Sequence, residues 1–154
     1  MKSPVPKTES LDALAARALA ARDNAYAPYS GYPVGAAILT SDGRIFDGCN
    51  VENLSFGATI CAERSAAVQA VGAGAKQFAA MAVISRDPTP CLPCGICRQF
   101  LSEFAGPDFQ VAACRADGSY EVYRFDSLFP HAFSSDSIGN KPDIAMDKTI
   151  ETKA

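Results

Sequence analysis

Three cysteines and one glutamate form the pattern in this chain that is best suited to chemistry. Cys61 and Glu63 stand in the segment Cys-Ala-Glu, and Cys94 and Cys97 stand in Pro-Cys-Gly-Ile-Cys. Three thiolates can bind one zinc ion and leave its fourth tetrahedral position to water, whereas a structural zinc site is closed by four protein ligands. The pattern therefore predicts a catalytic zinc site, with a carboxylate beside it that can accept and return a proton.

The positions of these cysteines predict that two helix starts meet at the metal. Cys94 and Cys97 are three residues apart in a predicted helix over 94–104, so their side chains share one face. Cys61 stands at the start of a second predicted helix, over 60–71. The first turn of a helix has unpaired N–H groups and the positive end of the helix dipole. Both helix starts should therefore stabilise thiolates.

The charge of the predicted site requires a compensating cation. Three thiolates on Zn²⁺ leave a formal charge of minus one, which would weaken the effect of the metal on a water molecule. Arg64, directly after Glu63, can hydrogen bond to the thiolates and offset this charge, and Arg98 is a second candidate. Either arginine could instead lie on a solvated helix face. Burial near an anionic core should raise the pKa of Glu63 toward neutrality, as a proton shuttle requires.

Cys91 offers an alternative in which the zinc site is purely structural. Cys91, Cys94 and Cys97 follow one another at intervals of three, so Cys91 could complete a closed four-cysteine site. Leu92-Pro93 should direct Cys91 away from the helix, however, and a closed site leaves Glu63 without a role. We favour the open site.

The remaining cysteines and the single histidine are expected to lie outside the metal site. Cys49 and Cys114 stand in apolar runs and should be buried in the core. His131, beside Pro130, should be a partly exposed loop residue and not a ligand or a base. Six cysteines in a chain without a secretory segment indicate reduced thiols and hence a cytoplasmic protein.

Length and composition favour one soluble domain. The chain has 154 residues, of which 48% are hydrophobic and 20% are charged. Its net charge of −3 argues against a nucleic-acid partner, and it has no stretch of about 20 apolar residues that could cross a membrane. We expect a flexible segment over 1–9, one domain over 10–133, and a polar, partly disordered tail over 134–154.

The elements that must position the site are predicted from apolar periodicity and from turn residues. A helix over 11–24 precedes two strands that form a hairpin around Ser41-Asp42-Gly43. The predicted strands cover 34–39, 44–49, 78–85, 109–114 and 120–125. This order of helices and strands predicts an α/β fold in which helices pack on one mixed five-stranded sheet.

Several motifs in one order resemble the small, homotetrameric zinc-dependent cytidine deaminases, whose kind of metal site the cysteines match. The resemblance extends from about Ala21 to Ser135. Its segments are Ala-Tyr-Ala-Pro-Tyr-Ser at 25–30, Val-Gly-Ala-Ala at 34–37, Gly-Cys-Asn-Val-Glu-Asn at 48–53, Cys-Ala-Glu-Arg at 61–64, Pro-Cys-Gly-Ile-Cys-Arg-Gln at 93–99 and Phe-Pro-His-Ala-Phe at 129–133.

The resemblance implies a three-layer α/β/α fold, one Zn²⁺ per subunit, and a role for each matching residue. It makes Cys61, Cys94 and Cys97 the ligands, Glu63 the proton shuttle and Arg64 a partner of the ligands.

The resemblance also implies how the substrate is held. Asn50 and Glu52 would bind the ribose hydroxyls, since an amide and a carboxylate together can donate and accept. Ala62 would donate its backbone N–H to the base carbonyl. Aromatic rings would flank the substrate at Tyr32 and Phe133, the latter from a neighbouring subunit, and Phe56 would be a further substrate-binding position. Phe56 departs from a tyrosine that is frequent in such proteins, and His131 replaces a small residue.

The function that the resemblance implies is hydrolysis of cytidine and 2′-deoxycytidine to the uridine nucleosides and ammonia, in pyrimidine salvage. Shared aromatic residues would make the protein a homotetramer with joint active sites. Three alternatives stay open at this point: a deaminase of a related nucleoside such as blasticidin S, a polynucleotide-editing deaminase, and a zinc-stapled binding module without activity.

Overall fold

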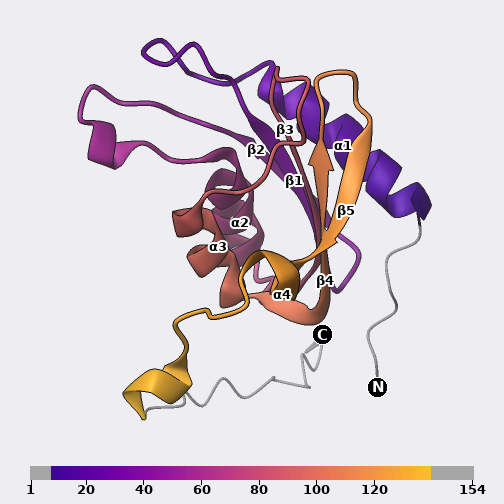
Figure 1. Ribbon diagram of the computed structural model, residues 1–154, viewed down its shortest axis with the longest axis vertical. Coiled ribbons are helices and arrows are strands. Elements are labelled where there is room, and N and C mark those ends of the chain that lie inside the picture. The colour runs from indigo at the N-terminus through magenta and orange to yellow at the C-terminus, as the bar shows by residue number, and fades with distance from the viewer. Residues whose placement is uncertain (1–7, 140–154) are drawn as a thin grey trace, which may run out of the picture.

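The computed structural model of the protein describes residues 8–139 (Figure 1). The described chain contains two short 3-10 turns, Phe56–Ala58 and Ser135–Ile138, in addition to its helices and strands. The helices and strands, in chain order, are α1 (Thr8–Arg22), β1 (Gly35–Thr40), β2 (Ile45–Cys49), α2 (Ala62–Gly72), β3 (Phe78–Ile84), α3 (Gly95–Ser102), β4 (Ala105–Cys114), β5 (Tyr120–Arg124) and α4 (Phe125–Leu128).

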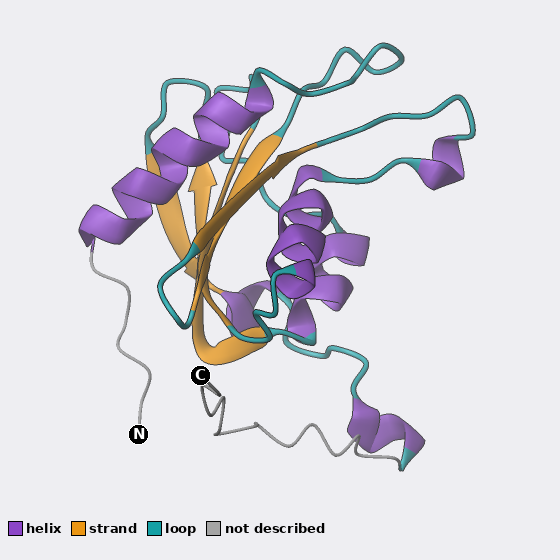
Figure 2. Cartoon of the chain, turned by 180° about the vertical axis from the view of Figure 1, so that it is seen from behind, coloured by secondary structure: helices purple, strands orange, loops and turns teal. Residues whose placement is uncertain are grey.

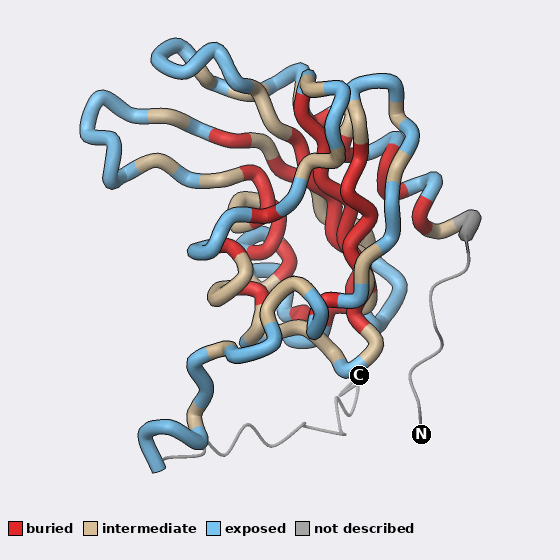
Figure 3. Tube along the Cα trace, in the orientation of Figure 1, coloured by how far each residue is buried: buried red, intermediate tan, exposed pale blue. Residues whose placement is uncertain are grey.

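The strands form one five-stranded sheet in the order β2-β1-β3-β4-β5. β3 and β4 are parallel, and all the other neighbours are antiparallel, so the sheet is mixed. β3 lies at its centre and is buried along almost its whole length, as its continuous apolar sequence predicts. Figure 3 shows the buried residues concentrated along the central strands and on the sides of the helices that face them.

Helices cover both faces of the sheet, which gives three layers (Figure 2). α1 packs on one face through a core that includes Leu11, Leu14 and Ile84. α2, α3 and α4 lie on the other face, over a core that includes Phe78 and Phe109. The predicted three-layer α/β/α architecture is therefore confirmed.

Two glycines let the helices approach the sheet backbone closely. A Cβ atom at Gly35 of β1 would lie 2.0 Å from the carbonyl oxygen of Ala18 in α1. A Cβ atom at Gly48 of β2 would lie 2.5 Å from the backbone nitrogen of Ala66 in α2. A side chain at either position would therefore force a helix away from the sheet. Gly48 has a direct consequence for the site, because the predicted metal ligand Cys61 and Glu63 stand at the start of α2.

The predicted element boundaries differ from the structure mainly around β4. This strand begins at Ala105, four residues earlier than expected, and includes Gly106-Pro107. Its pairing with β3 passes from Ala105 directly to Gln110, so the missing N–H of Pro107 interrupts no regular ladder. Phe125 begins α4 where the end of a strand was expected.

The two ends of the chain were assigned from composition alone. α1 begins at Thr8, inside the segment expected to be flexible, and Ser135–Ile138 forms a 3-10 turn inside the expected tail. The rest of the predicted tail, 140–154, lies outside the described residues. Within 8–139, no helix combines the length and the apolar character needed to cross a bilayer.

Candidate active site

The three predicted ligands converge at the starts of two helices. Cys61 and Cys94 occupy the N-cap positions of α2 and α3, and Cys97 lies in the first turn of α3. Their sulfur atoms all lie within 4.8 Å of one another, and the Sγ atoms of Cys61 and Cys94 are 3.8 Å apart. A tetrahedral zinc site with Zn–S bonds of about 2.3 Å requires sulfur atoms separated by ~3.8 Å. The thiol cluster therefore fits a zinc ion in both ligand type and spacing.

The surroundings of the cluster favour at least one thiolate before metal binds. Hydrogen bonding with the Cys97 thiol, together with the nearby Arg64 guanidinium, lowers the pKa of Cys61 to about 5. The same hydrogen bond raises the pKa of Cys97, so this pair holds a proton that metal binding would displace. Nη2 of Arg64 lies 3.6 Å from Sγ of Cys61 and donates to the carbonyl oxygen of Thr59 at 3.2 Å. Arg64 thus places a positive charge on the thiol cluster.

Arg98, the second candidate for this compensation, binds elsewhere. Its Nε donates to the carbonyl oxygen of Pro93 at 2.9 Å, and its Nη1 donates to that of Leu128 at 2.8 Å. The side chain therefore ties the residue before Cys94 to the end of α4.

Glu63 lies in the first turn of α2 with only 4% of its surface exposed. Burial, as the largest cause, raises the pKa of its carboxyl to about 7, and the nearby Cys61 contributes in the same direction. A carboxyl with a pKa near neutrality can both accept and return a proton at physiological pH. Glu63 therefore has the protonation behaviour that a proton shuttle requires.

Cys91 does not join the metal cluster. Among the described residues, the thiols that converge are Cys61, Cys94 and Cys97. The backbone N–H of Cys91 donates to the carbonyl of Cys114 at 3.0 Å, and burial raises the pKa of the Cys91 thiol to about 12. The position of Cys91 outside the converging thiols favours the open three-cysteine site over the closed one.

A cavity of about 350 Å³ opens beside the thiol cluster. It collects most of the predicted substrate-binding positions from three loops and the start of α2. Its lining comprises Ser30, Tyr32, Val34, Asn50, Glu52, Thr59, Cys61, Ala62, Glu63, Pro90, Cys91, Leu92 and Cys94. The cavity therefore brings the acid–base group, two of the thiols and several polar groups to one small volume, as a small-molecule site requires.

Asn50 and Glu52 are held in place by the loop that precedes β1. The Asn50 side chain accepts from the N–H of Val34 at 2.9 Å and donates to the carbonyl of Tyr32 at 2.9 Å. One carboxylate oxygen of Glu52 accepts from the backbone N–H groups of Tyr29 and Ser30 at 2.9 and 3.2 Å, and the other accepts from the Ser30 hydroxyl. Each side chain keeps unused hydrogen-bonding capacity, and both residues line the cavity.

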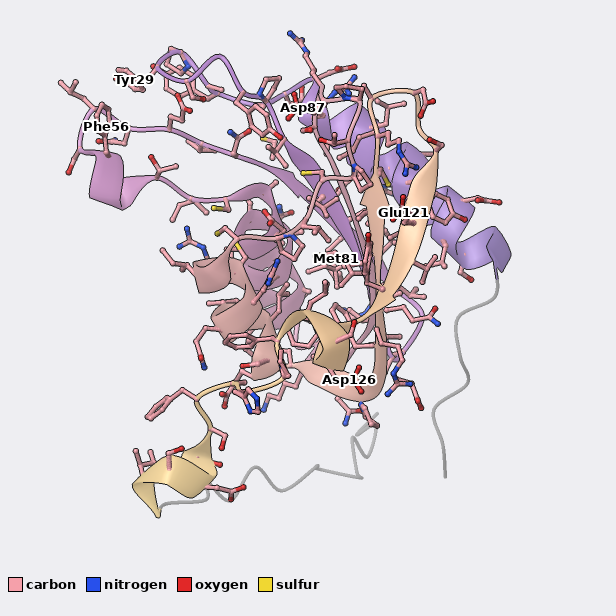
Figure 4. The ribbon with its side chains drawn as sticks, in the orientation of Figure 1. Tyr29, Phe56, Met81, Asp87, Glu121 and Asp126 are labelled. Atoms are coloured by element: carbon pink, nitrogen blue, oxygen red, sulfur yellow. The ribbon has the colours of Figure 1, made fainter. Side chains whose placement is uncertain are left out.

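The three predicted aromatic positions lie in different places. Tyr32 lines the cavity. Phe56 is 72% exposed and packs edge-on against Tyr29, with ring centroids 5.8 Å apart, at the tips of two projecting loops (Figure 4). Phe133 is 62% exposed, and its backbone carbonyl accepts a hydrogen bond from Gln99 at 2.9 Å. Within this single chain neither phenylalanine lines the cavity.

Comparison with known proteins identifies the family. The sequence model for the "Cytidine and deoxycytidylate deaminase zinc-binding region" matches residues 8–113, which include the thiol cluster and Glu63. The chain belongs to this family.

Individual members of the deaminase family resemble the chain over most of its length. The cytidine deaminase of Sporosarcina psychrophila is 41% identical over 128 residues, which are 83% of this chain and 94% of that protein. The crystal structure of cytidine deaminase from Burkholderia pseudomallei is 46% identical, with a TM-score of 0.75 over 79% of this chain and 97% of its own. The corresponding structure from Mycobacterium tuberculosis is 35% identical, with a TM-score of 0.71 over 84% and 99%.

Several cavity residues of this deaminase-family chain were not singled out from the sequence. Ser30, Thr59, Pro90 and Leu92 come from loops, where no periodicity indicates which side chains point inward.

The prediction for Cys49 was wrong. It was expected in the core, but it is only half-buried, and its thiol contacts the carbonyl oxygen of Asn24 at 3.4 Å. The other cysteine expected in the core, Cys114, is fully buried.

Proposed function

We propose that the protein is a zinc-dependent hydrolase that converts cytidine and 2′-deoxycytidine to uridine and 2′-deoxyuridine with release of ammonia. The observation that carries this proposal is the position of Glu63. Its buried carboxyl, with a pKa of about 7, lines a small cavity together with two members of a three-thiol cluster. The relatives that match most of the chain are named cytidine deaminases, which supports the choice of substrate.

In this proposal Cys61, Cys94 and Cys97 hold the zinc ion, and Arg64 compensates their negative charge. When bound, zinc supplies Lewis acidity that lowers the pKa of a water molecule to roughly 7. Cys61 and Cys94 line the cavity, and Cys97 is fully buried. An ion held by these three thiols would therefore border the substrate cavity.

Glu63 moves the protons of the reaction. Its carboxylate accepts a proton from the attacking water and delivers it to N3 of the cytosine ring as the water oxygen bonds to C4. The remaining proton of that oxygen passes through the same carboxyl to the amino group as the C4–N bond breaks. Ammonia then leaves, and the ring keeps a carbonyl at C4 and a proton at N3. A single carboxyl with a pKa near 7 can serve as both base and acid in this sequence.

Substrate binding is assigned to the polar lining of the cavity. Asn50 and Glu52 would contact the sugar hydroxyls, the backbone N–H of Ala62 would donate to the base carbonyl, and Tyr32 would pack against the substrate. Stacking of a base on an aromatic ring contributes about 1–3 kcal/mol in nucleic-acid systems. The cavity volume of about 350 Å³ suits one nucleoside. A net charge of −3 disfavours a polynucleotide substrate.

We further propose that the protein acts as a homotetramer with shared active sites, in the cytoplasmic salvage of pyrimidine nucleosides. Large apolar side chains are exposed in the single chain, among them Leu54, Phe56, Ile96 and Phe133. An assembly that joins such side chains into a contiguous apolar surface would bury them in an interface. In an assembly, Phe56 and Phe133 could reach the cavity of a neighbouring subunit. An active monomer in analytical ultracentrifugation would contradict this part of the proposal.

The proposal is tested by following the loss of cytosine absorbance with purified protein, cytidine and deoxycytidine. Turnover of both nucleosides, loss of turnover after chelation, recovery with added Zn²⁺ and one zinc per chain are expected. Blasticidin S is assayed in parallel. Turnover of blasticidin S alone would assign the protein to the rival nucleoside, and bound zinc without any turnover would favour the non-enzymatic module.

A further inference from the structure

Two loops that contribute to the cavity lining are joined by a side-chain hydrogen bond between Tyr32 and Asp87. Tyr32 lies on the loop between α1 and β1, and Asp87 lies on the connection between β3 and α3. The hydroxyl of Tyr32 donates to Oδ2 of Asp87 at 2.8 Å. Asp87 lies at the end of the sheet from which these loops leave (Figure 4). We refer to this contact as the Tyr32–Asp87 bridge.

The backbone at each residue of the bridge is held in place by further hydrogen bonds. The N–H of Tyr32 donates to the Ser30 hydroxyl at 3.0 Å, and its carbonyl accepts from Asn50. The N–H of Asp87 donates to the Ser85 hydroxyl at 3.2 Å, and its carbonyl accepts from the N–H of Ala116 at 2.9 Å. A hydrogen bond between two anchored segments fixes their separation.

The bridge joins Tyr32, a residue of the cavity lining, to the loop that carries Pro90 and Leu92 of the same lining. Tyr32 accepts a hydrogen bond from Asn50, and it is linked to Glu52 through hydrogen bonds of the Ser30 hydroxyl. Asn50 and Glu52 are the residues proposed to bind the sugar. Asp87 precedes Pro90, which also lines the cavity and is followed by the proposed ligand Cys94. The distance between the sugar-binding groups and the metal side of the cavity therefore depends on this contact. Burial, as the main cause, raises the pKa of Tyr32, so its hydroxyl remains a donor.

We propose that Asp87 is a positioning residue of the active site, which holds the Tyr32 ring against the substrate and sets the width of the cavity. The inference rests on the proposed deaminase function. Asp87 takes no part in proton transfer and, within the described chain, does not line the cavity. Its carboxylate acts on the substrate only through Tyr32.

The chain contains a matched contact away from the cavity. The hydroxyl of Tyr120 in β5 donates to Oδ1 of Asp12 in α1 at 2.6 Å. This contact also joins two separate elements through a tyrosine and an aspartate. Because it is remote from the cavity, its removal should affect stability without affecting substrate binding.

The test measures kcat and KM for cytidine in Y32F, D87A, D87N, the Y32F/D87A double variant and the control Y120F. We expect Y32F and D87A each to raise KM about fivefold, the factor that corresponds to loss of one hydrogen bond worth ~1 kcal/mol. kcat should stay within about twofold, because the ring contacts substrate and transition state alike. D87N keeps an oxygen acceptor and should restore a KM close to that of the wild type.

The double variant decides whether the two residues act through one contact. Y32F/D87A should be no worse than either single variant, whereas independent roles would multiply the two effects. Y120F should leave KM unchanged. If the wild type is active and neither Y32F nor D87A changes KM, the positioning role of Asp87 is overturned and the proposed function stands. A wild type that leaves cytidine and deoxycytidine unchanged would overturn the proposed function itself.

Discussion

Gly48 links the packing of the sheet to the geometry of the active site, and its replacement by alanine should damage both. The added Cβ would lie 2.5 Å from the backbone nitrogen of Ala66 and 2.8 Å from Cβ of Ser65. Ordinary contact begins at 3.4 Å, so α2 must move away from β2 by about 0.9 Å. Neither neighbouring atom is the end of a flexible side chain, and the strain cannot be relieved by a rotamer change.

The expected magnitudes follow from this displacement. Overpacking of this kind reduces the free energy of unfolding by about 1–3 kcal/mol. The start of α2 carries Cys61 and Glu63, and a displacement near 1 Å in a catalytic group can reduce activity ~100-fold. We therefore expect G48A to unfold at lower urea concentration and to lose between tenfold and 100-fold, roughly, in kcat/KM for cytidine.

The control is a glycine-to-alanine substitution at Gly72, the last residue of α2. A Cβ at Gly72 would meet no atom within 4 Å, so G72A should retain full activity and gain up to about 1 kcal/mol in stability. If G48A were as stable and as active as G72A, the link between the packing of α2 on β2 and the active site would be refuted.

Three further predictions concern the groups around the metal. In the zinc-free protein, the pKa of Glu63 is raised from 4.5 to about 7, so the folded state binds a proton more tightly than the unfolded state. The unfolding free energy of the wild type should therefore fall relative to that of E63Q as the pH rises from 4.5 to about 7, by on the order of 3 kcal/mol. A constant difference between the two proteins in urea unfolding across this range would contradict the prediction. R64Q removes the cation 3.6 Å from Sγ of Cys61 and should lower kcat and speed zinc release to a colorimetric chelator by at least about tenfold; unchanged zinc release would contradict the charge compensation. The C91A variant should still bind one zinc ion per chain. Loss of zinc in this variant would instead support the hypothesis of a closed four-cysteine site.

The individual strands and the helix face shared by Cys94 and Cys97 could be predicted from the sequence, because each depends on a short-range pattern. The apolar run of β3 and the hairpin around Asp42 specify strands directly. The interval of three between Cys94 and Cys97 specifies one helix face. The start of β4 was harder to predict from the sequence. Pro107 is disfavoured in a regular ladder, and only the irregular pairing with β3 accommodates it.

The cavity wall could be predicted only in part. Asn50 and Glu52 were found from a motif, but their hydrogen bonds to the loop before β1 join segments about 20 residues apart. The Tyr32–Asp87 bridge joins residues 55 positions apart, and no local pattern indicates it. The half-exposed position of Cys49 likewise depends on how closely α1 covers the end of β2. These features follow from the tertiary packing of loops and edges.

The central claim is that Glu63 moves protons beside a zinc ion held by three thiolates, and E63Q tests it most directly. Glutamine keeps the size of the side chain and removes its acid–base function. We predict that E63Q binds one zinc per chain and loses about 100- to 10,000-fold in cytidine turnover, while the exposed-site control E103Q remains fully active. Turnover of E63Q at the wild-type rate, with zinc retained, would contradict the account.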